Sequence, residues 1–173
     1  GVFCRPCFET IMRDSLFLCH RLPYPPNKGD KIRSHALFRH LAKRGPVHLA
    51  CFVDEEADFA HLEEVRKLAG GECHFEPLGK GTKTWRSLVG IATGKPLTTA
   101  CFGSRRLQAW VDRILRQRPI GDLVVFSSAM APYLLNASVS HARVLFDMVD
   151  IDSDKWRQYA MRSRGAFQWL YGR

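Results

Sequence analysis

The stretch LFLCHRLPYPPNKGDKIRSHALFRHLAKRGPVHLACFVD, residues 16–54, carries the clearest structural signal in the chain. An apolar run from Leu16 to Cys19 indicates a buried strand, and a proline-rich turn prevents regular structure directly after it. A basic amphipathic helix follows and is expected to end at Gly45-Pro46, before a second buried strand at Val47–Val53. A strand, helix and strand in this order predict a parallel βαβ unit.

The helix of this unit has a predicted cap and a predicted buried face. Asp30 can cap its first turn, because a short acidic side chain accepts hydrogen bonds from unpaired backbone N–H groups. The apolar residues that recur at helical spacing, and that we expect to be buried, are Ile32, Ala36, Leu37 and Leu41.

The rest of the chain continues this alternation. Further strands are expected at residues 73–78, 122–128 and 142–150, and helices at 55–71, 84–93, 104–118 and beyond 152, with a short helical segment to about 136. Continuous apolar strands covered on both faces predict an α/β fold, a Rossmann-like parallel sheet with helices on both faces. Right-handed crossovers would bring every strand's carboxyl end to one edge, where such sheets bind ligands.

Composition narrows the class of protein. The chain has 173 residues, 46% of them hydrophobic, and a formal net charge of +9, so we expect one globular domain that favours anionic partners. No nucleic-acid motif stands out, so nucleic acid is not an expected partner. No apolar run reaches the roughly 18–20 residues that span a bilayer, and the first residues lack a signal-peptide core, so a cytoplasmic location is expected.

The cysteines and histidines favour structural roles. Six cysteines are best explained as free thiols of a reducing compartment, mostly in or beside apolar stretches. No metal site is predicted, because the single C-x-x-C pair has no second pair and the histidines are scattered. His20 ends the first strand and is therefore expected to face the same edge as the loops described next.

The first of three loops with unusual chemistry is PPNKGDK, residues 25–31. Gly29 allows close approach of a ligand or a positive φ angle, and the amino end of the following helix favours a phosphate. Lys28 and Lys31 add positive charge. A tight strand-to-helix turn with solvated lysines remains an equal alternative.

The other two loops carry hydroxyls and carboxylates. Ser127 and Ser128 either bind a ligand oxygen or, as the favoured interpretation, cap the next helix. Asp147 and Asp150 lie in or at the end of the last strand, where a carboxylate is costly unless it is paired or used, and Asp150 can act as a base or bind a sugar hydroxyl. The polar cluster DSDKWRQY, residues 152–159, favours ligand binding over a solvated cap and includes Asp152 and Lys155.

Three segments together resemble a known family. Residues 16–54, VVFSSAMAPYLL (124–135) and FDMVDIDSDKWRQYA (146–160) are similar to the N-terminal half of family 4 glycosyltransferases, and most similar to the sugar transferases associated with PEP-CTERM/exosortase systems. The resemblance covers residues 16–173, and residues 1–15 form an extension outside it.

The resemblance implies a GT-B enzyme in which this chain is the acceptor-side, Rossmann-like domain and the donor domain is missing. The full-length enzyme would move a sugar, with retention of configuration, from a nucleotide sugar to a lipid-linked glycan acceptor in exopolysaccharide synthesis. It would use no metal and no further cofactor. Lys28, Gly29 and Asp30 would lie near the donor diphosphate or an acceptor phosphate. Asp150 would replace a histidine that related enzymes often carry near the end of the fifth strand. Peripheral contact with anionic membrane lipid is also implied.

Two other functions remain open. One is a stand-alone α/β module that binds a nucleotide or phosphate through the Gly29 loop without catalysis. The other is a basic adaptor for a membrane or nucleic acid, without a small-molecule site.

Overall fold

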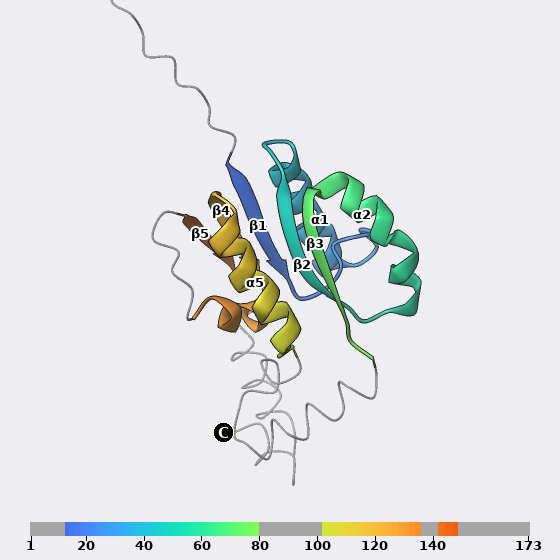
Figure 1. Cartoon of the computed structure of the whole chain (residues 1–173). Helices are drawn as coiled ribbons and strands as arrows, with labels where there is room; N and C mark the ends of the chain where they lie inside the picture. Colours follow the sequence, from blue (N-terminus) through green and yellow to red (C-terminus); the bar gives the residue numbers. More distant parts are fainter. Residues whose placement is uncertain (1–12, 80–101, 136–141, 149–173) are drawn as a thin grey trace, which may run out of the picture.

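Five parallel strands form one sheet in the order β3-β2-β1-β4-β5 (Figure 1). The computed structural model describes residues 13–79, 102–135 and 142–148. The strands are β1 (Asp14–Cys19), β2 (Val47–Val53), β3 (Gly70–Pro77), β4 (Ile120–Phe126) and β5 (Arg143–Asp147). The predicted class, a Rossmann-like α/β fold, is confirmed.

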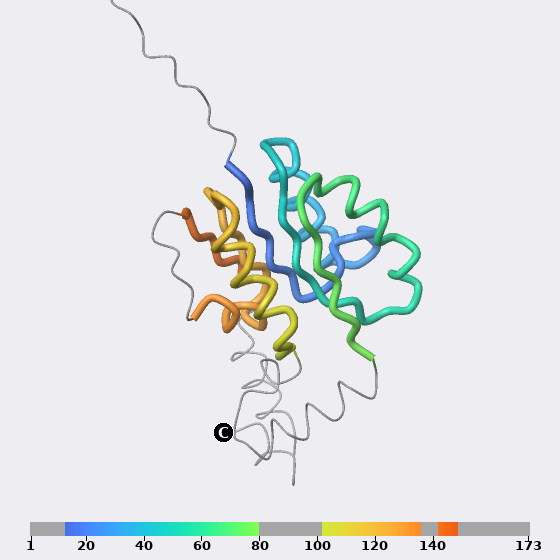
Figure 2. The backbone as a smooth tube through the Cα atoms, viewed as in Figure 1, coloured from blue at the N-terminus to red at the C-terminus, as the bar shows by residue number. Residues whose placement is uncertain are grey.

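Helices cover both faces of the sheet (Figure 2). On one face, α1 (Gly29–Ala42) and α2 (Leu62–Ala69) enclose a core with Phe17 and Cys19 of β1. On the other, α5 (Arg105–Gln117) and the 3₁₀ helix η2 (Ser128–Leu134) enclose a core that includes the alternate β1 residues. Burial on both faces explains why these strands are continuous apolar runs rather than alternating ones.

The sheet has a topological switch point between β1 and β4. The chain builds outward from β1 through β2 to β3, and then returns through α5 to place β4 on the other side of β1. The segments after β1 and β4 therefore lead to opposite faces of the sheet, and in such sheets ligands usually bind at the carboxyl edge beside this point.

The predicted buried face of α1 is right for Leu41, which is buried, and wrong for Ile32 and Ala36. Ile32 is 55% exposed, and Ala36 also faces solvent. The face turned to the sheet centres on Phe38, whose ring stacks on Phe17 with centroids 6.1 Å apart. It consists of Lys31, Ser34, Phe38 and Leu41. A lysine belongs to this face because a buried carboxylate pairs with it, which a pattern of apolar residues cannot reveal.

The predicted cap of α1 is also wrong. Lys28 occupies the N-cap position, and no side chain caps the helix. Asp30 lies within the first turn instead, where a negative charge still interacts favourably with the helix dipole.

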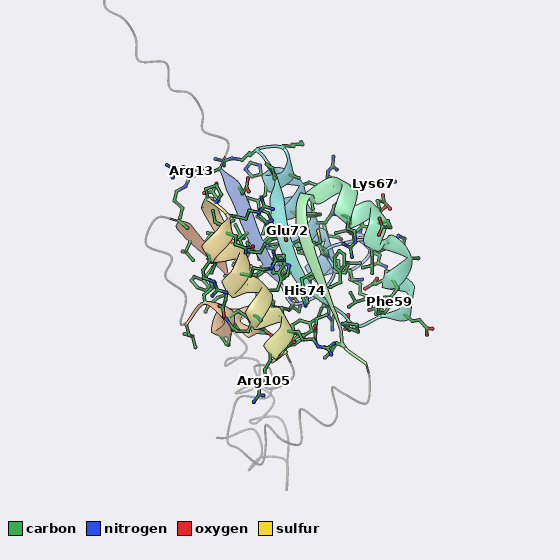
Figure 3. The ribbon with its side chains drawn as sticks, in the orientation of Figure 1. Arg13, Phe59, Lys67, Glu72, His74 and Arg105 are labelled. Atoms are coloured by element: carbon green, nitrogen blue, oxygen red, sulfur yellow. The ribbon has the colours of Figure 1, made fainter. Side chains whose placement is uncertain are left out.

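The helix predicted at 55–71 is two elements, the 3₁₀ helix η1 (Glu56–His61) and then α2. Asp58 turns inward in η1, so that Phe59 points outward and is largely exposed (Figure 3). Gly70 ends α2 with φ = 64°, a left-handed conformation that glycine adopts without strain, as the Gly70-Gly71 pair predicts.

The prediction for α5 is confirmed. Ser104 caps it by accepting a hydrogen bond from the Leu107 N–H group at 3.3 Å. Its buried residues are Leu107, Trp110, Val111 and Ile114. The helices predicted at 84–93 and beyond residue 152 lie outside the described residues.

The predicted burial of thiols is confirmed for Cys19 and Cys51, which are free and buried. Burial raises the pKa of the Cys19 thiol to about 12, so this group is inert at neutral pH. None of the helices within the described ranges combines the length and hydropathy needed to cross a bilayer.

Gly71→Ala is expected to lower the free energy of unfolding by about 1–3 kcal/mol. A Cβ atom there would lie 2.6 Å from the backbone carbonyl oxygen of Val47 on the adjacent strand, where neither backbone can yield easily. Urea denaturation measures the difference. Stability equal to that of the wild type would show that the β2–β3 contact is looser than described.

Candidate functional site

The ends of β1, β4 and β5 meet at the carboxyl edge of the sheet. The Ser127 N–H group after β4 donates to the Asp147 carbonyl oxygen at 2.9 Å. Arg33 of α1 reaches the Asp147 carboxylate, with Nη2 2.8 Å from Oδ1. Arg33 of α1, Ser127 and Asp147 are therefore in contact at this edge.

Gly29 is the first residue of α1 and has open space beside it. Its φ angle is not positive, since Gly70 is the positive-φ glycine within the described residues, so the expectation of a special backbone conformation is not met. A Cβ atom at Gly29 would meet nothing within 4 Å. Neither backbone conformation nor internal packing therefore requires glycine here, and close approach of a ligand remains as a reason for it.

The basic side chains of the Gly29 loop already have acidic partners on the connection after β2. Lys28 donates to Glu55, and this hydrogen bond raises the pKa of Lys28 and lowers that of Glu55. Arg21 bridges Asp30 at 3.3 Å and Asp54 at 3.2 Å. The backbone N–H groups of the uncapped first turn are thus the part of this loop best placed to receive an anion.

Lys31 is buried, contrary to the alternative of a solvated lysine. Its Nζ atom lies 2.7 Å from both carboxylate oxygens of Asp58, and both side chains are almost fully inaccessible. This pair ties the first turn of α1 to η1. The buried face of α1 has the helical spacing 31, 34, 38 and 41 in the sequence. A reader of the sequence recognises this pattern only by allowing a lysine to be buried.

His20 lies at the switch point, as its place at the end of β1 predicts. Its ring stacks on Phe126 of β4 (centroids 5.8 Å apart, interplanar angle 11°), and Nε2 is 3.6 Å from Asp30 Oδ2. Burial lowers the pKa of His20, Arg21 lowers it further, and the negative charge of Asp30 opposes both. The imidazole is therefore neutral at pH 7 and can exchange hydrogen bonds with a hydroxyl group.

Ser127 of the serine pair caps the following 3₁₀ helix, the interpretation favoured from the sequence. Ser127 Oγ accepts a hydrogen bond from the Ala129 N–H group at 3.3 Å, and Ser128 begins η2. Ser127 also has φ = 85°, an uncommon conformation for a residue with a side chain, and such strain is concentrated at ligand sites. Capping and a ligand contact through the backbone are compatible here.

Asp147 is paired, which satisfies the requirement that a carboxylate in an apolar strand have a partner. The remaining predicted site residues, Asp150, Asp152 and Lys155, lie outside the described residues.

A second polar cluster joins β3 to α5 near the same edge. Glu76 accepts from Ser104 Oγ at 2.8 Å and lies 3.2 Å from His74 Nε2, while Tyr133 Oη accepts from the Ser104 N–H group at 2.8 Å. Figure 3 shows His74 on the α5 side of β3, and Arg105 extending from the amino end of α5 away from the sheet. These contacts hold the start of α5 in place. Within the described ranges, no group of three His, Cys, Asp or Glu side chains is arranged to hold a metal ion.

A scan against protein-family models and searches of curated proteins and of solved structures give no match to this chain.

Lys31→Met is expected to lower the free energy of unfolding by about 3–5 kcal/mol, because it leaves Asp58 buried without its cation. The double variant Lys31→Met/Asp58→Leu removes both charges and is expected to recover most of this loss. Urea unfolding followed by tryptophan fluorescence measures both. A single variant as stable as the wild type would contradict the buried pair.

The pKa of His20, measured by NMR titration of its ring, is expected to lie below the ordinary 6.5. Asp30→Asn should lower it further, because this change removes the charge that favours the imidazolium form. The unfolded chain binds a proton at the higher, ordinary pKa, so stability should fall as the pH drops below about 6.5, and less so in His20→Gln. A His20 pKa at or above 6.5 would contradict this expectation, because it would mean that the attraction of Asp30 and Asp54 offsets the effect of burial.

Proposed function

We propose that the chain is the acceptor-side, N-terminal domain of a GT-B glycosyltransferase. The enzyme would transfer a sugar from a nucleotide sugar to a glycan acceptor, lipid-linked in our proposal, during exopolysaccharide synthesis. The observation that carries the proposal is Gly29, whose missing side chain leaves space at the uncapped amino end of α1, beside the switch point. The resemblance of three segments to family 4 glycosyltransferases supports it independently.

The physical basis is an anion site made by the backbone. The 14-residue helix α1 presents unpaired N–H groups and the positive end of its dipole at the carboxyl edge of the sheet. Without a Cβ atom at Gly29, a phosphate oxygen can come close to these groups. The anion in this proposal is the diphosphate of the nucleotide sugar or a phosphate of the acceptor.

Each residue of the Gly29 loop then has a separate role. Gly29, Asp30 and Lys31 offer backbone N–H groups, and the buried side chain of Lys31 holds the turn in place. Lys28 would share its ammonium group between Glu55 and the ligand, since both of these side chains are exposed enough to rearrange.

The other edge residues suit a hydroxyl-rich ligand. His20 and the segment with Ser127 and Ser128 lie at the switch point, and Asp147 pairs with Arg33 beside them. Asp150 as the catalytic carboxylate, with Asp152 and Lys155 as ligand contacts, stays a prediction on residues outside the described ranges.

The leaving diphosphate in this proposal is stabilised by basic groups and helix ends rather than by a metal. The donor-binding half would lie outside these 173 residues, so we expect the chain to bind ligand without transferring sugar. Membrane contact would be peripheral, at the cytoplasmic face, with the exposed Arg105, Arg106 and Arg116 of α5 as lipid contacts.

Binding is tested by titrating the ¹⁵N-labelled chain with UDP, GDP and inorganic pyrophosphate and following amide shifts. The Gly29 and Asp30 amides are expected to move. Gly29→Ala should weaken binding about tenfold or more by blocking the approach of a phosphate oxygen. The same change should leave the free energy of unfolding equal or raise it by up to about 1 kcal/mol, because alanine favours helix.

The matched control compares the two ends of α1. Lys28→Gln at the site should weaken binding, whereas Lys43→Gln at the opposite end of the helix should not, although both remove one exposed positive charge. The proposed anion site fails if none of the three ligands shifts amides at this edge, or if Gly29→Ala binds as tightly as the wild type. Binding without sugar transfer by a chain extended through a second domain would favour the stand-alone module instead.

A further inference from the structure

The strand β5 forms an edge of the sheet with unusual exposure of apolar side chains. The described residues pair it with β4 on one side and leave its outer edge unpaired (Figure 1). Leu145 is 53% exposed and Phe146 is 48% exposed, and Val144 and Met148 are also exposed. Because an edge strand presents free N–H and C=O groups, such a strand is a template for pairing with another strand.

The sequence of β5, RVLFD (143–147), is complementary to itself when two copies run antiparallel. A two-fold axis through Leu145 places Arg143 opposite the second copy's Asp147, and Val144 opposite the second copy's Phe146. Leu145 then faces its own counterpart. Every opposed pair is thus either oppositely charged or apolar, the combinations that stabilise cross-strand neighbours.

The side-chain geometry within one copy agrees with this register. Arg33 of α1 contacts Asp147, so Asp147 lies on the face of the sheet that α1 covers. Leu145 and Arg143 lie on the same face, because side chains two residues apart in a strand point to the same side. Arg143 donates two hydrogen bonds to the Asp122 carboxylate of β4, and its side chain is 76% exposed. Its guanidinium can therefore also reach a carboxylate of a second copy paired along the outer edge of β5. Arg33 contacts Asp147 Oδ1, and the Asp147 side chain is 10% exposed in a single copy. Oδ2 is the oxygen that we assign to the second copy's Arg143, which would reach it from the outer edge of β5.

We propose that two copies of this chain pair antiparallel through β5, joining their sheets into one continuous sheet across a two-fold axis. The contact involves five strand residues from each copy, which is small beside the interfaces of permanent dimers. The association is therefore weak and reversible, with a dissociation constant in the micromolar range or above. It shares Asp147 with the carboxyl edge described above but involves neither Gly29 nor a ligand, so the proposed anion site can fail without affecting it.

Sedimentation equilibrium of the full chain at about 5–500 μM tests the proposal, a range that brackets micromolar affinity. The wild type is expected to follow a monomer–dimer equilibrium. Leu145→Lys and Leu145→Glu should each weaken it at least about tenfold, because like charges then meet at the two-fold axis. An equimolar mixture of the two variants should restore dimers, since lysine then faces glutamate.

The matched control is Leu135→Lys, which places the same charge on another exposed leucine, at the end of η2. It should leave the equilibrium unchanged, and association lost equally in this variant would indicate nonspecific hydrophobic contact and overturn the proposal. A monomeric wild type over the whole range, or a mixture of Leu145 variants that stays monomeric, would also overturn it. So would a large loss of unfolding free energy in Leu145→Lys, because this loss would mean that another part of the same chain covers β5.

Discussion

The buried ion pair between Lys31 and Asp58 fixes how α1 is rotated on the sheet. Removing two charges from water is costly, and the cost is offset only when the partners meet in good geometry, as they do here with both carboxylate oxygens 2.7 Å from the ammonium nitrogen. With Lys31 directed inward, Ile32 must face solvent and Arg33 is directed toward the end of β5. The same rotation leaves Gly29 open at the carboxyl edge.

Charge is distributed unevenly around this edge. The chain as a whole carries +9, yet the cations near the Gly29 loop are paired with Asp54, Glu55 and Asp58 from the connection after β2. An anion at this site would therefore depend on backbone N–H groups and the dipole of α1 more than on free lysines. Arg105 and Arg106, at the start of α5, are exposed and supply positive charge on a different part of the surface.

The strands and α5 were predictable because their signals are local. Val47–Val53 is a continuous apolar run, and α5 combines a serine cap with a regular apolar stripe. The rotation of α1 and the break between η1 and α2 were not predictable, because both depend on Lys31 meeting a residue 27 positions away. Neither member of this charged pair is apolar, so the spacing of apolar residues does not reveal the pair.

The sheet edge at which the candidate site lies was predictable, because the topology of a parallel sheet determines it. Parallel strands bring the segments after β1, β4 and β5 to one edge, which placed Gly29, Ser127 and Asp147 correctly relative to the sheet. The partners of these residues, such as Glu55 for Lys28 and Arg33 for Asp147, come from distant positions and required the structure. The positive φ angle of Ser127 had no signal in the sequence, since glycine is the residue that usually marks it.

A crystal structure of the chain with a bound nucleoside diphosphate tests the role of the open space at Gly29 most directly. The account predicts a phosphate oxygen about 3 Å from the backbone nitrogen of Gly29 or Asp30, at the amino end of α1. A diphosphate bound on the exposed arginines of α5, with the space beside Gly29 empty, would contradict it.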